Sequence, residues 1–188
     1  MNRHRILYTL GVVFALLCSC TDYDTWTSDP RAHLTFGNDT ISFDTILSTV
    51  SSSTQRLLVY NNNKEGLRIN EVRLKKASAS PFRVNVDGEF LQGGTGYDFE
   101  VRGNDSIFVL LEATLPEANV DTIITYSDSL CFLLESGEMQ YVTLLADGQD
   151  ALHWRGVTVV DKDTTFNSKR PIIIYDSLYV SPGVTLQI

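Results

Sequence analysis

The chain has 188 residues, with 15 basic and 23 acidic side chains and a formal net charge of −8 at pH 7. An acidic protein repels the phosphate backbone of nucleic acids, so this charge balance argues against a nucleic-acid partner. The chain has three cysteines, too few for a disulfide framework, so the fold has to depend on its hydrophobic core.

Residues 1–20 have the layout of an export signal. Arg3, His4 and Arg5 make a basic start, and an apolar stretch of residues 6–17 follows. This stretch is shorter than the roughly 20 residues that span a bilayer, and it matches the length of a signal core. We therefore expect residues 1–19 to be a removable signal peptide.

The segment ends in Leu17-Cys18-Ser19-Cys20, which resembles a bacterial lipobox. The resemblance implies cleavage between Ser19 and Cys20, followed by lipidation of Cys20 on its sulfur and on its new amino group. Buried acyl chains gain about 0.8 kcal/mol per CH₂, which is enough to hold a folded domain on a membrane. The alternatives are a plain secretory signal with a stray cysteine, or an uncleaved anchor helix.

Cleavage would remove two arginines and no acid, which changes the formal net charge from −8 to −10. Asp22 and Asp24 then stand directly behind the lipid. Early acidic residues resemble the signal that sends lipoproteins of one group of Gram-negative bacteria to the outer face of the outer membrane. We expect an outer-membrane, lipid-anchored protein that faces outward, although a polar tether of this kind also stays solvated without any such signal.

The cysteines differ in their expected roles. Cys18 would leave with the signal and Cys20 would carry the lipid, so Cys131 would be the one remaining thiol. Cys131 lies in the apolar run Leu130–Leu134. We expect it to be a buried small hydrophobe, not a nucleophile, and we expect no disulfide.

Residues 20–33 are polar and are expected to form a lipidated tether. From Leu34 onward the apolar residues alternate with polar ones, and no stretch of helical length carries an apolar stripe. This pattern predicts an all-β chain with strands over residues 34–36, 41–43, 55–60, 67–74, 82–86, 97–101, 107–113, 122–126, 129–135 and 139–146.

Two local features refine this prediction. The alternation slips at Asn70-Glu71, which suits a β-bulge, and Asp87-Gly88 predicts a tight hairpin. The residues expected in the core, one from each of several strands, are Leu58, Ile69, Phe82, Val109, Phe132 and Leu144.

Short strands separated by regular turns over residues 34–148 predict an antiparallel two-sheet β-sandwich. The order of Leu58-Val59-Tyr60-Asn61-Asn62, Leu67-Arg68-Ile69, Ser80-Pro81-Phe82 and the closing Leu144-Leu145-Ala146-Asp147-Gly148 resembles immunoglobulin-like domains of the ASPM–SPD-2–Hydin type. One departure is that Asp147-Gly148 stands where the family has Gly-x-Gly. The resemblance implies a structural or binding module without catalytic residues.

The pattern changes after Gly148. Residues 149–171 are expected to be a linker with one or two strands. Residues 172–188 resemble the entry rung of a right-handed parallel β-helix, because Leu178-Tyr179-Val180 is followed by Gly183 and Val184-Thr185-Leu186-Gln187-Ile188. Such rungs stack in series and several are needed to bury a core, so the tail reads either as a truncated rung or as extra strands on the sandwich.

Catalytic constellations are sparse. His33 and His153 stand far apart, the Gly-rich Gly93-Gly94-Thr95-Gly96 lies between β segments, and no zinc-site spacing is present. The paired acids, Asp147 with Asp150 and Asp161 with Asp163, read as solvated turn residues. We therefore expect no catalytic residue, no metal and no cofactor.

His153-Trp154-Arg155 has two interpretations. Trp buries a large area where two modules meet, which favours a plug between domains. The alternative is an aromatic contact with carbohydrate.

The triplet of Asp, then Ser or Thr, then Ala, Ile, Leu, Val, Met or Thr occurs seven times. An Asp turn leading into a strand that begins with Thr and Ile is ordinary in β proteins. The triplet also resembles an acceptor signal for O-linked glycans in the bacterial group mentioned above. The candidate acceptors are Thr40, Thr45, Ser106, Thr122, Ser129, Thr164 and Ser177.

Together these patterns predict a non-catalytic, membrane-anchored lipoprotein with a structural or ligand-presenting sandwich. Its partners would be the membrane, through the N-terminal lipid, and a glycan or a protein. The alternative is the N-terminal module of a carbohydrate-processing or carbohydrate-binding β-helix protein whose active part lies beyond Ile188. A second alternative is an adhesin or filament subunit that exchanges strands with its neighbour.

Overall fold

The computed structural model describes residues 24–188. The signal peptide, Ser19 and Cys20 lie outside the described residues. The described chain is almost entirely β, with two short 3₁₀ segments, η1 (Ala77–Ala79) and η2 (Gln92–Gly94).

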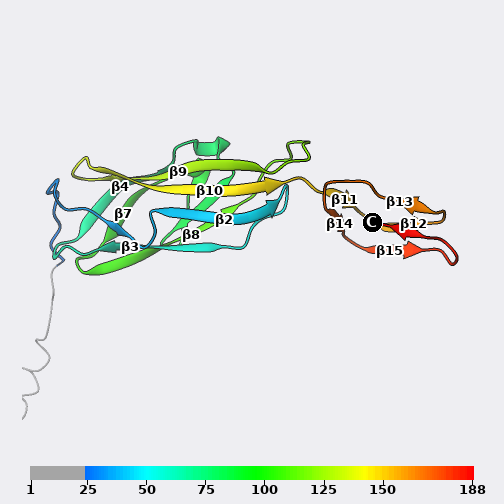
Figure 1. The fold of residues 1–188 in the computed structure, drawn as a ribbon. Coiled ribbons are helices and arrows are strands. Elements are labelled where there is room, and N and C mark those ends of the chain that lie inside the picture. Colours follow the sequence, from blue (N-terminus) through cyan, green and yellow to red (C-terminus); the bar gives the residue numbers. More distant parts are fainter. Residues whose placement is uncertain (1–23) are drawn as a thin grey trace, which may run out of the picture.

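Two five-stranded sheets form the N-terminal body (Figure 1). In sheet I the strands follow the order β1 (Thr35–Phe36), β3 (Gln55–Asn61), β8 (Asp105–Ala113), β5 (Phe82–Val86) and β6 (Glu89–Phe90). In sheet II they follow the order β2 (Thr40–Leu47), β10 (Met139–Gln149), β9 (Ile124–Leu134), β4 (Leu67–Leu74) and β7 (Thr95–Val101). Neighbouring strands of the two sheets are antiparallel except β2 and β10, which run parallel.

The core lies between the sheets. One contiguous cluster of buried apolar side chains extends from Ala32 to Ala146, and Phe43 of sheet II meets Phe82 of sheet I with their ring centroids 5.8 Å apart. The predicted all-β fold, an antiparallel immunoglobulin-like sandwich with a C-terminal β extension, is confirmed. The exception to antiparallel pairing is the contact between β2 and β10.

Most of the expected core residues are buried, and one is not. Five of them are less than 4% exposed: Ile69, Phe82, Val109, Phe132 and Leu144. The prediction was wrong for Leu58, because Leu57 and Val59 on either side of it point into the core instead. Side chains alternate across a strand, so a shift of one residue moves Leu58 to the outer face.

The local turn predictions are confirmed. The pairing of β4 with β9 shifts register between Ile69 and Glu71, at the slip in the apolar pattern. Asp87 and Gly88, with φ values of 49° and 92°, connect β5 to β6 in the left-handed conformation that a two-residue hairpin requires. The two strands expected at residues 122–126 and 129–135 are instead one long strand, β9.

The described part of the expected tether belongs to the sandwich. Trp26 forms a bridge with Gly66, and a Cβ at position 66 would collide with its ring. The Arg68 guanidinium lies 5.0 Å from the centroid of the Trp26 ring, and Arg102 pairs with Asp24 at 3.1 Å. The tether prediction is therefore wrong for residues 24–33, because the Trp26 ring packs directly over Gly66, which has no side chain.

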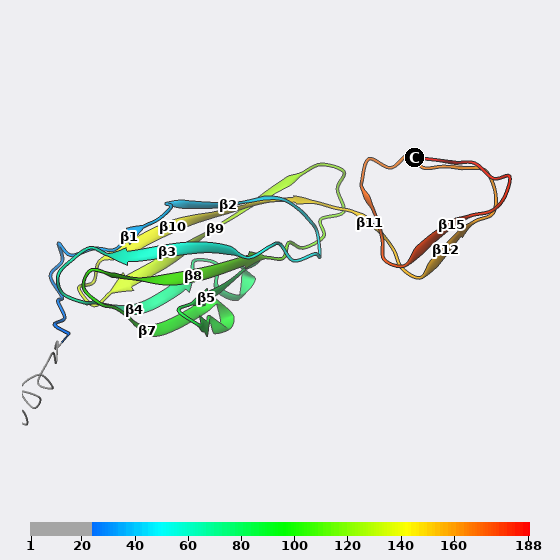
Figure 2. The same cartoon turned by 90° about the horizontal axis from the view of Figure 1, so that it is seen from below.

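Residues 151–188 wind into two stacked turns that are built of short strands and lie apart from the two sheets. We call this segment the coil. The first turn contains β11 (Leu152–Trp154), β12 (Val157–Val160) and β13 (Thr164–Thr165), and the second contains β14 (Ile172–Ile174), β15 (Ser177–Val180) and β16 (Leu186–Gln187). Each strand of the first turn pairs in parallel with one of the second, 20 to 22 residues later in the chain. Figure 2 shows the coil as a triangle beside the end of the sandwich.

This pairing changes the expected boundary within the C-terminal segment. The expected linker, residues 149–171, supplies three strands, and residues 172–188 pair with them and not with the sandwich strands. The sequence pattern predicted the strands of the second turn more clearly than those of the first, because Gly and Pro residues separate the strands of the second turn more regularly.

Candidate functional site

The junction between sandwich and coil is built around Asp150. Its side chain is 3% exposed, and its two carboxylate oxygens accept hydrogen bonds from the backbone N–H groups of Ala118, at 3.2 Å, and Val120, at 2.9 Å. A hydrogen bond from the Ser48 hydroxyl, together with those backbone donors, lowers the pKa of Asp150 to about 2, against the opposing effect of burial. Asp150 is thus a buried structural anion, and the expectation of a solvated turn acid was wrong.

A second ionic contact crosses the same junction. The guanidinium of Arg170, which precedes β14, donates to the carboxylate of Asp121 in the loop between β8 and β9 at 2.7 Å. The Arg170 side chain is 19% exposed, less than any other basic side chain in the ion pairs of the described residues, whereas Asp121 is 58% exposed. Asp150 and Arg170 therefore hold both turns of the coil to one loop of the sandwich.

The segment His153-Trp154-Arg155 belongs to the coil, and its side chains contact other residues of the coil. The Trp154 ring packs against Phe166, with centroids 4.6 Å apart. His153 Nδ1 is hydrogen-bonded to the Tyr175 hydroxyl at 2.8 Å, and the Arg155 guanidinium lies 4.1 Å from the centre of the Tyr175 ring. The contacts of Tyr175 link the first turn to the second. The aromatic partners of the segment thus lie within the coil, and the predicted plug between domains is wrong.

The coil also carries partly exposed aromatic groups. Tyr175 is 42% exposed and Tyr179 is 53% exposed. Tyrosine rings with an apolar face and a hydroxyl suit contacts with sugars or proteins.

The candidate O-glycan acceptors all lie outside the core. Thr40, Thr45, Thr122 and Ser177 are exposed, whereas Ser106, Ser129 and Thr164 are partly buried. Several of the preceding aspartates have structural partners: Asp128 accepts from the Ser129 N–H at 2.8 Å, and Asp163 accepts from the Thr185 N–H at 2.7 Å. The triplets are thus accounted for in part as turn and strand-entry residues.

A groove of about 650 Å³ opens on the sandwich between Lys76, Pro116 and Tyr126. Its polar groups are already engaged, since Lys76 Nζ donates to the Ser127 carbonyl at 2.6 Å and the Tyr126 hydroxyl donates to Pro116 at 3.4 Å. No nucleophile and base face one another among the residues that line it.

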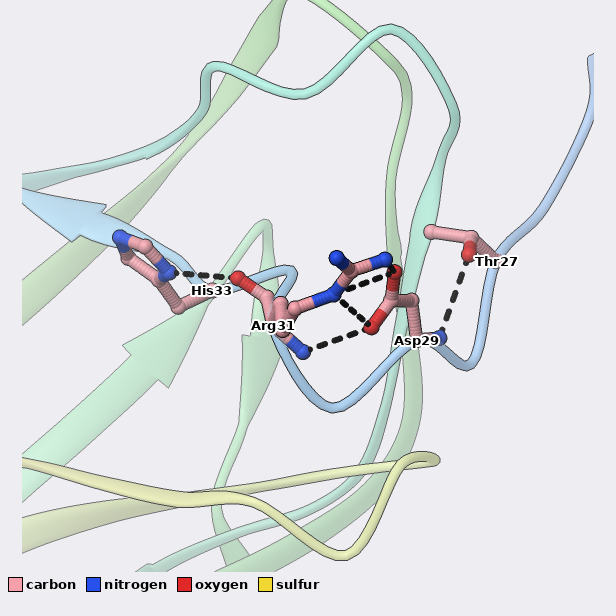
Figure 3. Close-up of polar contacts among 4 residues, drawn as sticks. All are labelled: Thr27, Asp29, Arg31 and His33. Carbon is pink, nitrogen blue, oxygen red and sulfur yellow. Dashed lines mark hydrogen bonds and ion pairs between the residues drawn. The ribbon is translucent and has the colours of Figure 1, made fainter.

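The segment before β1 holds His33, the second histidine of residues 24–188, in a structural arrangement (Figure 3). Asp29 accepts from the Arg31 guanidinium at 2.8 Å, and this partner lowers the pKa of Asp29 to about 2. Nδ1 of His33 donates to the Arg31 carbonyl at 2.9 Å. The geometry fixes the course of the chain into β1 and places no reactive group beside His33.

Cys131 is 2% exposed, as predicted for a buried small hydrophobe. Burial raises the pKa of its thiol, which keeps it protonated and unreactive. Within residues 24–188 no group of three or more His, Cys, Asp or Glu side chains is arranged to hold a metal ion.

Sequence reasoning missed a buried asparagine. Asn61 is fully buried, and its side chain donates to the carbonyls of Glu65 and Val101 and accepts from Asn63. The run Asn61-Asn62-Asn63 marked the end of β3, but the partners of Asn61 become visible only when β7 lies beside the turn.

No family model matches the chain, and no curated protein is similar to it in sequence. Similar solved structures include the ASH/PapD-like domain 7 of human CEP192, with 13% identity over 71% of this chain and 98% of that one and a TM-score of 0.41. A family 123 glycoside hydrolase from Clostridium perfringens matches with 6% identity over 70% of this chain and 31% of that one, with a TM-score of 0.44. The E. coli chaperone DraB matches with 13% identity over 61% of this chain and 54% of that one, with a TM-score of 0.38. At these levels of similarity nothing about the activity of this chain follows from them.

Proposed function

We propose that this chain is a non-catalytic, lipid-anchored protein whose sandwich holds the coil of residues 151–188 away from a membrane. The observation that carries the proposal is the placement of the two ends. Residues 24–33 enter the sandwich at one end, and the coil leaves at the other (Figure 1). A lipid on Cys20 would therefore place the whole length of the sandwich between the membrane and the coil.

The junction supports a positioning role. Asp150 and the Arg170–Asp121 pair bind the coil to the loop between β8 and β9, and the side chains of Asp150 and Arg170 are mostly shielded from water. Two such contacts restrict rotation of the coil more than a flexible linker would. The sandwich would then present the Tyr175 and Tyr179 surface in one orientation.

The anchor would be the N-terminal lipid. In the part of the chain that the structure describes, no helix is both long and apolar enough to cross a bilayer. The lipobox supports attachment through Cys20, and Asp22 and Asp24 support export to the outer face of the outer membrane.

Metabolic labelling with a palmitate analogue tests the anchor in the full chain. Wild type should take up label and sediment with membranes, whereas Cys20→Ala should lose the label and accumulate as an uncleaved precursor. Cys18→Ala is the matched control, because its cysteine would leave with the signal, and it should label as wild type does. Equal labelling of Cys20→Ala and wild type would refute lipidation at Cys20.

A second candidate function is carbohydrate binding by the coil, as the first part of a carbohydrate-binding or carbohydrate-processing β-helix. It is favoured by the exposed Tyr175 and Tyr179 and by the polar groups of His153 and Arg155 beside Tyr175. Glycan-array binding that is lost in Tyr179→Ala but kept in Tyr141→Ala would support it, since Tyr141 is 54% exposed on the sandwich instead.

We also propose O-glycosylation at the exposed triplets. Thr45 is exposed on β2, whereas Ser129 follows a buried aspartate and is itself half-buried. Intact-mass measurement on protein from its native host should show one glycan fewer in Thr45→Ala and no change in Ser129→Ala. An unmodified wild-type mass would contradict the proposal.

A further inference from the structure

The two sheets of the sandwich differ in how their arginines are neutralised. The basic side chains in the strands of these sheets are four arginines, two in each sheet. In sheet II, Arg68 donates to Glu100 at 3.2 Å, and Arg73 lies 2.7 Å from Glu71. Each arginine of sheet II therefore has an acidic partner at hydrogen-bond distance.

The arginines of sheet I, Arg56 and Arg83, have no such partner. Nη2 of Arg83 is 3.9 Å from Oε2 of Glu112, which is too far for a hydrogen bond, and Oε1 of Glu112 accepts from the Thr54 hydroxyl at 2.8 Å instead. Among residues 24–188 no acidic group forms an ion pair with Arg56. Two guanidinium groups without a close anion favour an anionic ligand at this sheet.

Strand register puts both arginines on the outer face of sheet I. Arg56 of β3 lies opposite Leu110 of β8, and Arg83 of β5 lies opposite Glu112, two residues further along β8. The residues that follow the two arginines in β3 and β5 are buried in the core, so the arginines themselves point outward. In Figure 2, β3 and β8 lie on the near side of the sandwich.

A hollow of about 270 Å³ opens on this outer face. Phe90 and Leu110 form its apolar part, while Arg83, Asn85 and Glu112 contribute polar groups to its lining. Strand pairing aligns Phe90, Asn85 and Leu110 in one row across β6, β5 and β8. Small-molecule sites usually have volumes of about 300–1,000 Å³, so a hollow near the lower limit suits a single ring.

The charge close to the hollow is positive on balance. Glu112 is the acid that lines it, and Arg56 stands beside Arg83 as a second base on the same face. Glu89 lies opposite the buried Val86 and so belongs to the core side of the sheet, and Asp87 is in the hairpin turn and does not line the hollow. Salt screens charges over about 8 Å, so a bound ligand meets this local excess more strongly than the net charge of the chain.

The polar groups of the hollow can both donate and accept. Oδ1 of Asn85 accepts from the Gly88 N–H at 2.9 Å, which leaves the Nδ2 group to donate. Within the described residues the Arg83 guanidinium makes no hydrogen bond, and Oε2 of Glu112 accepts none. A sugar ring offers hydroxyls that donate and accept, together with a face of C–H groups that packs on an aromatic ring such as Phe90, which is 45% exposed.

We propose that this hollow binds a sugar residue that carries a carboxylate, as a uronic acid does. The planar guanidinium of Arg83 would pair with the carboxylate, and Arg56 would add to the attraction from across Leu110. A sugar hydroxyl would donate to Oε2 of Glu112, and the ring would pack against Phe90. The site lies on sheet I and is independent of any carbohydrate binding by the coil.

Isothermal titration calorimetry of the full chain in detergent, with an oligosaccharide of glucuronic acid, tests this proposal. We expect saturable binding that weakens as salt is added, and Arg83→Gln should weaken it at least tenfold. Arg83→Lys keeps the charge but loses the planar fork, so it should weaken binding by a smaller factor. Arg73→Gln is the matched control, because it removes the same charge from sheet II, and it should bind as wild type does.

The control ligand is the same oligosaccharide with its carboxylates reduced to alcohols, which should bind at least tenfold more weakly. Thermal melting accompanies each titration. The Arg83 side chain is 59% exposed, so its variants should melt within a few degrees of wild type.

Four outcomes would overturn the proposal. The first is a wild-type protein that does not bind the oligosaccharide, and the second is equal affinity for the charged and the reduced forms. The third is an equal loss in Arg83→Gln and Arg73→Gln, or a loss in Tyr179→Ala alone, which would place the binding outside the hollow. The fourth is an oligoglutamate peptide that binds as tightly as the oligosaccharide, which would show that the ligand is an acidic peptide.

Discussion

The carboxylate of Asp150 joins three separate parts of the chain. It accepts from backbone donors at Ala118 and Val120, and Ser48 beside it donates its own N–H to the Gln149 carbonyl at 2.9 Å. These partners lie about 30 and 100 residues from Asp150 in the sequence. A single acidic residue after a strand therefore gave no sign, in sequence alone, of whether it would be solvated or buried.

Replacement of this group should have a measurable effect on stability. Asp150→Asn keeps the size of the side chain but removes the charge that the N–H groups of Ala118 and Val120 stabilise, so the melting temperature at pH 7 should fall by several degrees. Asp161→Asn, at an exposed position, is the control and should melt as wild type does. Differential scanning calorimetry makes the comparison.

The pH dependence provides a second test of the same residue. The pKa of Asp150 is lowered from 3.8 to about 2, so its ionised form stabilises the fold above pH 4. That contribution should be lost as the pH falls from about 4 towards 2, where the folded protein takes up the proton. The difference in melting temperature between wild type and Asp150→Asn should therefore shrink in that window. A difference that stays constant between pH 7 and pH 2 would contradict the assignment.

The strands of the coil depend on one another more than those of the sandwich do. Within the coil, Ala151 and Val160 are buried, whereas inward residues such as Leu152, Trp154 and Leu178 are only half-buried. Two turns enclose little volume, so cross-turn hydrogen bonds have to contribute more of the stability. One such bond runs from the N–H of Gly156 to the Asp176 carboxylate at 2.6 Å.

Loss of this bond should loosen the corner between β11 and β12. In Asp176→Ala we expect faster hydrogen exchange at the amides of residues 157–160, because β12 loses its fixed start, with no change at Val109 in the sandwich. Asp161→Ala, which alters an exposed acid in the same coil, serves as the control. Unchanged exchange in Asp176→Ala would mean that the parallel pairing of β12 with β15 alone holds the corner.

The whole molecule consists of a sandwich with its own core and a coil attached at one end. The contiguous buried cluster contains residues from Ala32 to Ala146 and none from the coil. A sandwich of this size has enough buried apolar surface to fold alone.

A chain that ends after Asp150 should therefore keep a cooperative fold. We expect a β-type circular dichroism spectrum and one sharp thermal transition from residues 20–150, with the same melting temperature in the presence and absence of dithiothreitol. Restoring residues 151–188 should raise that temperature, since Arg170 then holds Asp121. A spectrum of an unfolded chain would show that the coil strands complete the core of the sandwich.

Much of the fold could be predicted from local patterns. The alternation of apolar residues indicated most strands, the slip at Asn70-Glu71 indicated the bulge, and Asp87-Gly88 indicated the hairpin. The burial of Cys131 was also predicted correctly, because this residue lies in the apolar run Leu130–Leu134. Each of these depends on neighbours within a few residues, whose steric and hydrogen-bonding preferences act before any distant contact forms.

Contacts between distant segments decided the rest. Leu57 and Leu58 are both apolar, and only the position of sheet II determines that Leu57 faces the core and that Leu58 lies on the opposite side of sheet I. The burial of Asp150 and the parallel pairing of residues 152–165 with residues 172–187 likewise depend on partners that the local sequence does not specify. Side-chain direction and strand partner are set by the free energy of packing whole elements together, so both became defined only in the folded protein.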